Sequence, residues 1–452
     1  MPYTHDVFGL STNIREYSYV DRNNLDKKIL RLLKRDTHIA LKGASKSGKS
    51  WLRQKCIPDA IVVQCRLGMT IEDIYRTALS SIGVSFDTST TKSTTTSGEL
   101  DGQLELKVPV VVKTEVGGTF AFEGEKSTTA DDYHRSISNL EFVAAAVKAT
   151  NKRLIIEDFH YLSIPERRRM AHDLKTLWDY KCFVVLIGVW TQTNLLTSLN
   201  PDLTGRIEEI SILWTPEDLH SVISKGTAFL NVAIDESIKD SLVNDSFGNV
   251  GILQILLLKY IEDEADIEET LPTLLYLTDP DCYQRAAKAY ADQLDGRYQQ
   301  FAKLLSTGIR KRKKATGIYA YAMEAIVSAS DEALINGFPR SVIFDITNAK
   351  QPRIKKGNLK TVLGKLIELQ EPEKGHDLVI SYDESIDAVF VVDRQLLFYR
   401  KYKAINLILG DVPKEIFSGR RIYIPEIFPP NGAGAVLNWK FLLDSGVIGV
   451  VL

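Results

Sequence analysis

The amino-acid sequence predicts an α/β fold, in which helices cover both faces of a parallel sheet. Between residues 37 and 212, short runs of β-branched and apolar residues alternate with stretches of helical period. The short runs are apolar almost throughout, as expected of strands that are buried on both faces. The expected strands are His38 to Leu41, Ile61 to Gln64, Arg153 to Glu157, Phe183 to Val189 and Ile207 to Ile212.

Capping residues mark the helices that accompany these strands. Ser163-Ile-Pro-Glu166 predicts a capping box, and Thr215-Pro-Glu-Asp218 places a proline at the start of a helix. A third helix is expected after Thr70, because apolar residues then recur at helical spacing until Gly83.

Length and composition indicate a globular protein of two or three domains. The chain has 452 residues, of which 44% are hydrophobic and 25% are charged, and no apolar run is long enough to cross a membrane. The 56 Lys and Arg residues nearly balance the 58 Asp and Glu residues, so a nucleic-acid surface would have to be a local patch. The N-terminus lacks a basic start followed by an apolar run, so we expect a soluble, cytoplasmic protein.

The cysteines and histidines do not suggest a metal site. Cys56, Cys65, Cys182 and Cys282 lie far apart in the sequence, and the seven histidines have no ligand spacing. We therefore expect buried, reduced thiols and no transition metal.

The pattern divides the chain into four parts. We expect an α/β core at 1–214, an almost wholly helical lid at 215–305, a winged helix at 306–402 and an unassigned segment at 403–452. A Ser/Thr-rich tract and a Gly117-Gly118 turn predict a hairpin inserted into the core at about 86–130. This hairpin is either a tolerated surface insertion or a contact for a partner.

A glycine-rich loop follows the first expected strand. Residues Gly43 to Ser50 fit the pattern GxxxxGK[ST] and precede a helical stretch. Its two glycines permit backbone conformations that turn N–H groups toward phosphates. Lys49 would neutralise phosphate charge, and the Ser50 hydroxyl would bind Mg²⁺. We expect ATP and Mg²⁺ here, contacted by Gly43, Ser45, Lys46, Ser47, Gly48, Lys49, Ser50 and Trp51.

Two acids, Glu157 and Asp158, follow the apolar run of the third expected strand. Carboxylates in this position can hold the metal and polarise a water. Both are candidate metal ligands with Ser50; we assign Glu157 chiefly to the metal and Asp158 chiefly to the attacking water. An exchange of these roles stays open, and the alternative is that both acids only cap a strand end at the surface.

Polar residues around the last two strands add further candidates. Thr191 or Gln192, after the fourth strand, would sense the γ-phosphate; the alternative is an ordinary turn. Arg206 precedes the fifth strand and is a candidate to reach the ATP of an adjacent subunit. The alternative for Arg206 is an ion pair with Glu208 or Glu209.

These motifs, in this order, resemble the AAA+ superfamily. The resemblance is to the branch shared by origin-recognition ATPases, transposition-helper ATPases and STAND signalling ATPases, and it covers roughly residues 15 to 265. Gly43 to Ser50 matches Walker A, Leu154 to Asp158 matches Walker B, and Arg206 matches the arginine before the last core strand. Two residues depart from the pattern. Glu157 stands where an aspartate is usual, and Gly251 stands where many members have a lid arginine.

The resemblance implies a fold and a set of functions. It implies a five-stranded parallel sheet, a helical lid and an ATP-dependent switch that drives homo-oligomerisation, with Gly251 favouring slow hydrolysis. The segment with Tyr19, Val20 and Arg22 looks like one that touches the adenine in that branch. A STAND-type signalling ATPase that needs a trigger and an effector protein is the first hypothesis, with bacterial anti-phage defence as its setting.

A DNA-binding ATPase is the alternative. Basic residues concentrate in the expected winged helix, and duplex DNA is their natural counterpart. They are Arg310 to Lys314, Arg353 to Lys356, Lys360 and Lys365. Apolar residues at helical spacing between Leu359 and Leu369 require part of the same helix to face a core, which favours a regulatory or packing role instead.

Overall fold

The core of the chain is a parallel sheet of five strands, seen in a computed structural model. The structure describes residues 1–84, 137–190, 192–307, 317–370 and 378–403, which all belong to one unit, Met1–Lys414. The strands are β1 (His38–Lys42), β2 (Ala60–Gln64), β3 (Arg153–Glu157), β4 (Val184–Gly188) and β5 (Ile207–Ser211). Their order in the sheet is β2-β3-β4-β1-β5. The predicted α/β fold and all five predicted strands are confirmed.

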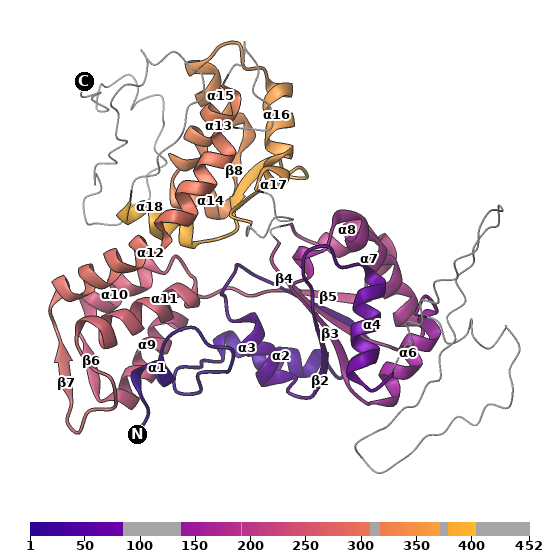
Figure 1. The fold of residues 1–452 in the computed structure, drawn as a ribbon, viewed down its shortest axis with the longest axis horizontal. Helices are drawn as coiled ribbons and strands as arrows, with labels where there is room; N and C mark the ends of the chain where they lie inside the picture. Colours follow the sequence, from indigo (N-terminus) through magenta and orange to yellow (C-terminus); the bar gives the residue numbers. More distant parts are fainter. Residues whose placement is uncertain (85–136, 191, 308–316, 371–377, 404–452) are drawn as a thin grey trace, which may run out of the picture. The chain divides into compact units, whose positions relative to one another are not determined.

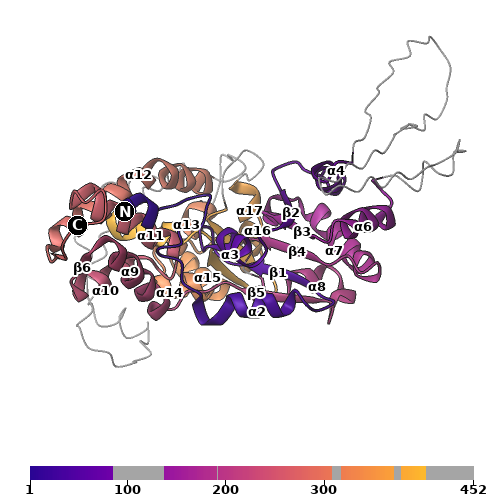
Figure 2. The same ribbon diagram turned by 90° about the horizontal axis from the view of Figure 1, so that it is seen from below.

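Helices cover both faces of this sheet (Figures 1 and 2). Apolar side chains of four helices pack with the sheet into one buried cluster, and those of two helices form a second cluster. The first group is α4 (Ile71–Ser81), α6 (Leu140–Ala149), α7 (Ile164–Asp179) and α8 (Leu195–Leu199). The second group is α2 (Leu25–Leu32) and α3 (Lys49–Cys56). Short turns of 3-10 helix are η1 (Arg22–Asn24), η2 (Phe159–Tyr161) and η3 (Pro201–Leu203).

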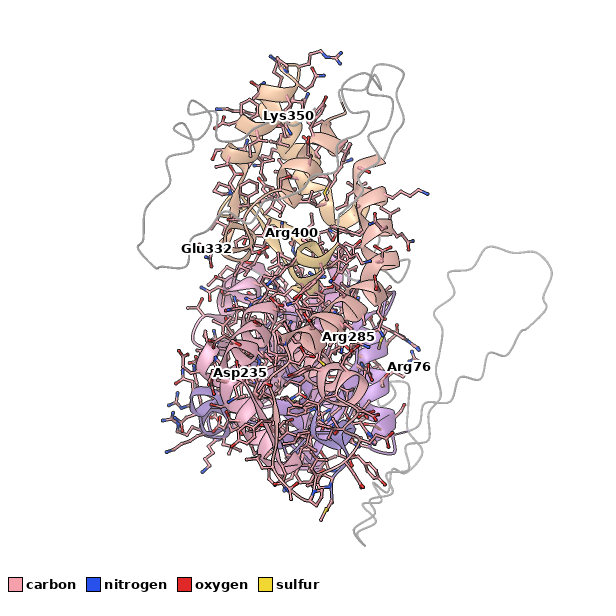
Figure 3. The ribbon with its side chains drawn as sticks, turned by 90° about the vertical axis from the view of Figure 1, so that its left-hand side faces the viewer. Arg76, Asp235, Arg285, Glu332, Lys350 and Arg400 are labelled. Atoms are coloured by element: carbon pink, nitrogen blue, oxygen red, sulfur yellow. The ribbon has the colours of Figure 1, made fainter. Side chains whose placement is uncertain are left out.

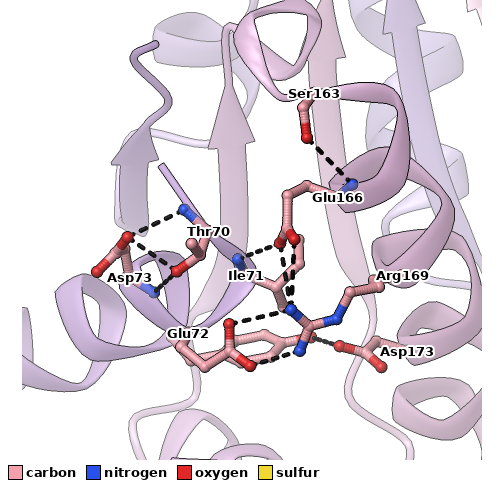
Figure 4. A network of polar contacts seen from close by, with 9 residues as sticks. Thr70, Ile71, Glu72, Asp73, Ser163, Glu166, Arg169 and Asp173 are labelled. Carbon is pink, nitrogen blue, oxygen red and sulfur yellow. Dashed lines mark hydrogen bonds and ion pairs between the residues drawn. The ribbon is translucent and has the colours of Figure 1, made fainter. Parts of the chain in front are cut away.

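The start of α7 differs in one respect from the predicted capping box. Ser163 Oγ accepts the N–H of Glu166 at 3.4 Å, as expected. The Glu166 carboxylate does not return to Ser163 but accepts the N–H of Ile71 at 2.8 Å and contacts Arg169 (Figure 4). Arg169 also pairs with Glu72, so this network ties α7 to the start of α4. The prediction of a capping box was wrong because the N–H of Ile71, which is distant in the sequence, binds the Glu166 carboxylate.

The lid region contains four helices and a π-helical turn. They are α9 (Pro216–Leu230), α10 (Glu236–Asp245), α11 (Val250–Leu258), η4 (Lys259–Glu264) and α12 (Pro280–Thr307). The short N-terminal helix α1 (Thr4–Val7) joins them through a bond from Thr4 Oγ1 to the Ile267 carbonyl at 2.6 Å. The prediction of an almost wholly helical lid missed a parallel pair of short strands, β6 (Val232–Ile234) and β7 (Leu275–Leu277). These strands are too short to show a period in the sequence.

The following part combines helices with a three-stranded antiparallel sheet of order β8-β10-β9. Its strands are β8 (Phe338–Pro339), β9 (Ile380–Asp383) and β10 (Ala388–Val391). Its helices are α13 (Ile318–Val327), α14 (Asp331–Asn336), α15 (Arg340–Lys350), α16 (Lys356–Gly364), α17 (Leu366–Leu369) and α18 (Gln395–Tyr402). Arg400 of α18 (Figure 3) donates to the Val327 and Ala329 carbonyls at 3.0 Å each. The winged-helix assignment stays a prediction, as do the boundaries of the four parts.

Several predictions fall outside the described residues. They concern the hairpin at 86–130, Thr191, the basic run Arg310 to Lys314 and the segment from residue 404 onward. Among the described helices, none is long and apolar enough to cross a membrane. The four cysteines are free thiols, but Cys282 is partly exposed rather than buried as predicted. Cys282 lies in the first turn of α12, where it contacts Asp279 and Arg285.

Candidate nucleotide-binding site

The glycine-rich loop joins β1, a fully buried strand between β4 and β5, to helix α3. Gly48 has φ +81° and stands at the N-terminal cap of α3, in a conformation that favours glycine. Gly43 is packed so closely that a Cβ would lie 2.8 Å from Ser47 Oγ and 3.1 Å from the Ile212 carbonyl. Both glycines are therefore needed for the fold of the loop.

The carbonyl groups of the loop are bonded to donors around it. Lys49 Nζ donates to the Gly43 and Ala44 carbonyls at 3.1 and 2.6 Å. The next three carbonyls accept from residues distant in the sequence. These bonds are Asn249 Nδ2 to Ser45 O at 2.8 Å, Gly251 N to Lys46 O at 3.1 Å and Trp214 Nε1 to Ser47 O at 3.0 Å. These bonds hold the backbone of the loop in one conformation, and within the loop the Ser47 N–H donates to the Ala44 carbonyl at 3.3 Å.

Polar groups of the loop and of α3 fit a phosphate ligand. Lys49 is 9% exposed, and burial lowers the pKa of its ammonium group to about 8, so it remains a cation at neutral pH. Ser47 Oγ is buried and has no hydrogen-bond partner among the described residues. Ser50 is exposed at the first turn of α3. Trp51 instead donates from its indole nitrogen to the Ser11 carbonyl at 2.9 Å and so anchors the N-terminal segment.

The two predicted acids have different partners. Glu157, the last residue of β3, accepts from Arg53 Nε of α3 at 3.1 Å, and their side chains are only 10% and 15% exposed. Asp158 accepts from Gln64 Nε2 at 3.0 Å and borders an open cleft of about 840 Å³. Both carboxylates act to raise the pKa of Lys49, so they lie within electrostatic reach of the loop. Their division into metal ligand and water base stays a prediction.

The segment after β4 lies beside the loop, at the carboxyl end of the sheet. There Lys42 Nζ, at the end of β1, pairs with Glu209 at 2.7 Å and donates to the Gln192 carbonyl at 3.0 Å. This ion pair shows that Glu209 does not serve Arg206. The role of Gln192 as a phosphate sensor stays a prediction.

Arg206 lies at the opposite end of the sheet from the loop. The register pairs His38 with Ile207, so Arg206 precedes β5 at the amino end of the strands, about 16 Å along a five-residue strand. Its guanidinium stands over the Trp178 ring at 4.9 Å and donates to the Asp202 carbonyl. Arg206 is thus too far to serve the loop of its own chain, and the predicted finger role requires a second subunit.

The N-terminal segment approaches the same loop. Tyr19 is buried, with its hydroxyl donating to Asp26 at 2.8 Å, and its carbonyl accepts from Lys225 of α9 at 2.7 Å. Val20 is partly buried next to it. Arg22 stands over the ring of Trp214 at 4.2 Å. Contact of Tyr19, Val20 and Arg22 with a nucleotide base stays a prediction.

The lid touches the loop at Gly251, the position at which many members of the resembled superfamily have a lid arginine. A Cβ on Gly251 would lie 2.5 Å from Lys46 Cβ and 2.7 Å from the Lys46 carbonyl oxygen, so no side chain fits there. Lys46 Nζ also donates to Gln395 Oε1 of α18. Sequence reasoning missed Arg53, Trp214, Asn249 and Gln395 as neighbours of the loop. Only Trp214 carried a signal, as a single aromatic residue between the last core strand and the capped helix that follows.

Comparisons with known proteins show similarity at the level of the fold. No protein-family model matches the sequence, and no curated protein matches it. The Orc1 protein of Aeropyrum pernix, solved in complex with DNA, is similar at 10% identity and a TM-score of 0.35, over 85% of this chain and 92% of that one. A STAND protein of Pyrococcus horikoshii with a tetratricopeptide repeat sensor has 14% identity and a TM-score of 0.35, over 85% and 43% of the two chains. The RuvB branch migration motor of Thermotoga maritima has 13% identity and a TM-score of 0.33, over 84% and 95%.

The observed sheet agrees with the five-stranded parallel sheet that the motifs predict. Its strand order is β2-β3-β4-β1-β5, and the glycine-rich loop follows β1, an interior strand between β4 and β5.

Proposed function

We propose that this chain, which has a P-loop fold of the AAA+ type, is a molecular switch that binds ATP with Mg²⁺, hydrolyses it slowly and signals by nucleotide-dependent oligomerisation. The observation that carries the proposal is the bonding of the loop. Lys49, Asn249, Gly251 and Trp214 hold its carbonyls, and the loop ends at the N-terminus of α3, where the helix favours an anion. Ser50 and the acids Glu157 and Asp158 would hold the ion, which would supply charge neutralisation at the phosphates.

The contact at Gly251 supports slow hydrolysis. An arginine from the lid would add a cation at the developing phosphate charge, and such cations contribute strongly to phosphoryl transfer. At Gly251 the backbone lies against Lys46 and leaves no space for a side chain. Turnover would then depend on Arg206 of another subunit, which links hydrolysis to assembly.

The lid contacts support a switch. The same loop that would cradle phosphates is bonded to α11 through Asn249 and Gly251, and to α18 through Gln395. Two nucleotides that contact the loop differently would therefore favour different positions of these helices. A trigger protein and an effector protein belong to this proposal, and bacterial anti-phage defence is carried over from the sequence resemblance alone.

Nucleotide binding and assembly are tested on the same variants. We expect the wild type to bind ATP in calorimetric titration and to become larger in size-exclusion chromatography with a non-hydrolysable ATP analogue and Mg²⁺. Lys49→Ala should lose both, whereas Lys27→Ala, an exposed lysine of α2, should keep both. Arg206→Ala should bind ATP normally and lose turnover. A wild type that binds no ATP, or stays a monomer with every nucleotide and trigger tried, would count against the switch.

A DNA-binding ATPase is the second candidate, supported by one surface. Helix α16 buries Leu359, Val362 and Leu363, while Arg353, Lys355, Lys356 and Lys360 are exposed on or just before it. Phosphates of a duplex would match this cluster. The charge reversal Lys356→Glu with Lys360→Glu should weaken duplex binding at ~0.15 M salt and reduce its salt dependence. If the wild type does not bind duplex DNA under these conditions, the candidate is excluded.

A further inference from the structure

Arg22 carries a buried positive charge that forms no ion pair within the described residues, although Asp26, Asp218 and Asp21 lie close enough to act on its pKa. Its side chain is 4% exposed, and within the described residues its Nε and Nη2 atoms have no hydrogen-bond partner. Burial lowers the pKa of its guanidinium to about 10, so the group remains charged at neutral pH. Buried charges in proteins are ordinarily paired, because an isolated charge loses its hydration without compensation.

Other arginines whose pKa burial lowers do have acceptors. Arg400 pairs with Asp331, and Arg394 donates to the Gly248 carbonyl at 3.1 Å. Asp26, one of three acids that act to raise the pKa of Arg22, accepts instead from the Tyr19 hydroxyl at 2.8 Å. The Nε atoms of Arg400 and Arg22 are both buried without a partner among the described residues, and Arg22 differs in that its Nη2 atom is unpartnered as well.

The guanidinium of Arg22 lies at the phosphate loop. Its Nη1 atom is 3.6 Å from the point where a Cβ on Gly48 would stand, at the N-terminal cap of α3. The guanidinium also stands over the ring of Trp214 at 4.2 Å, and the indole nitrogen of Trp214 donates to the Ser47 carbonyl. The charge of Arg22 acts to lower the pKa of Lys49, so the two cations lie within electrostatic reach of each other, while Asp158 and Glu157 act on Lys49 in the opposite direction.

The backbone around Arg22 fixes the side chain in this position. Asn23 and Asn24 both adopt the left-handed conformation, with φ of 48° and 54°, which asparagine tolerates better than most residues. Lys225 of the lid holds the preceding turn through the Glu16 and Tyr19 carbonyls. Arg22 is thus held in place before any ligand arrives, which reduces the entropy lost on binding.

We propose that Arg22 binds a phosphate group of the nucleotide, and not its base. Together with Lys49 it would form a pair of cations that recognises nucleoside di- and triphosphates, so that ADP is retained as well as ATP. This inference rests on the proposed nucleotide binding and deepens it, because the segment of Arg22 was expected to touch adenine.

The test compares a ligand with a base and one without. ADP and inorganic tripolyphosphate are titrated by displacement of a fluorescent nucleotide from wild type, Arg22→Gln and Arg31→Gln, an exposed arginine of α2. Arg22→Gln should weaken both ligands by about 10- to 100-fold, as expected for a lost charge-assisted hydrogen bond. Arg31→Gln should weaken neither. A loss for ADP alone would assign Arg22 to the base, and no loss for either ligand would make its role structural; both results overturn the inference.

A second variant guards against loss of the fold. Arg22→Met removes a buried unpaired charge at similar length, so the ligand-free protein should melt at the same temperature or higher while ADP still binds at least 10-fold more weakly. A stable Arg22→Met protein with unchanged ADP affinity would overturn the inference. If wild type itself binds neither ligand, the proposed nucleotide binding fails, which is a separate outcome from unchanged binding by the Arg22 variants.

Discussion

Replacing Gly251 by alanine tests whether the lid really rests on the phosphate loop. The new methyl group would lie 2.5 Å from Lys46 Cβ and 2.7 Å from the Lys46 carbonyl oxygen, whereas ordinary contacts begin at 3.4 Å. The first turn of α11 must therefore move away by roughly 1 Å, because backbone and Cβ atoms cannot rotate aside. That movement also lengthens the bond from Gly251 N to Lys46 O, now 3.1 Å.

The sign of the effect follows from the opposing magnitudes. Overpacking costs ~1–3 kcal/mol and the weakened hydrogen bond ~0.5–1.5 kcal/mol, while alanine favours the helix over glycine by ~1 kcal/mol. We expect a net loss of about 1–3 kcal/mol and, for a chain of 452 residues, a melting temperature lower by about 1–3 °C in a thermal unfolding scan. Gly357 is the matched control, because it is also the second residue of a helix and nothing lies within 4 Å of its Cβ position. Gly357→Ala should melt at the same temperature or slightly higher, and an equal rise for Gly251→Ala would refute the contact.

Three further predictions concern buried ionisable side chains. Burial lowers the pKa of Lys49 to about 8, and a bound phosphate should raise this pKa again. ATP binding should therefore take up a proton at pH 8.5 but not at pH 6.5. Calorimetric titrations in buffers of different ionisation enthalpy measure this proton uptake. Burial lowers the pKa of His38 from 6.5 to about 4, so the unfolded chain binds a proton at a higher pH than the folded chain does. The free energy of unfolding should therefore fall by about 3 kcal/mol between pH 6.5 and 4. Urea unfolding of His38→Gln across this pH range should lack that contribution to the pH dependence of stability. Arg53→Ala should lower the free energy of unfolding by urea by about 3–5 kcal/mol, because Glu157 stays buried without its partner. A similar loss in the double variant Arg53→Met with Glu157→Leu, which removes both charges, would contradict the ion-pair explanation.

The elements that the sequence predicted well are those with a local signal. All five core strands are short apolar runs, and their observed limits lie close to the predicted ones. The helix after Thr70 and the one after Thr215 start at their predicted caps because the cap bonds join residues three apart. The helical spacing between Leu359 and Leu369 belongs to two helices, α16 and α17, which are separated at Lys365, and β6, β7 and α15 were not anticipated. Short elements of this kind are stabilised by their neighbours and not by their own propensity.

The sequence by itself determined the phosphate loop, because its pattern of glycines, Lys49 and Ser50 prescribes a backbone conformation within eight consecutive residues. It also indicated that Glu157 and Asp158 would meet this loop, since the carboxyl ends of parallel strands share one edge of a sheet. Only the tertiary structure decided that Asn249, Gly251 and Trp214 hold the loop's carbonyls and that Arg53 pairs with Glu157. It also decided that the Nε and Nη2 atoms of Arg22 are buried without a hydrogen-bond partner among the described residues. These contacts join residues far apart in the chain, and which of them form depends on how the lid and the core pack together.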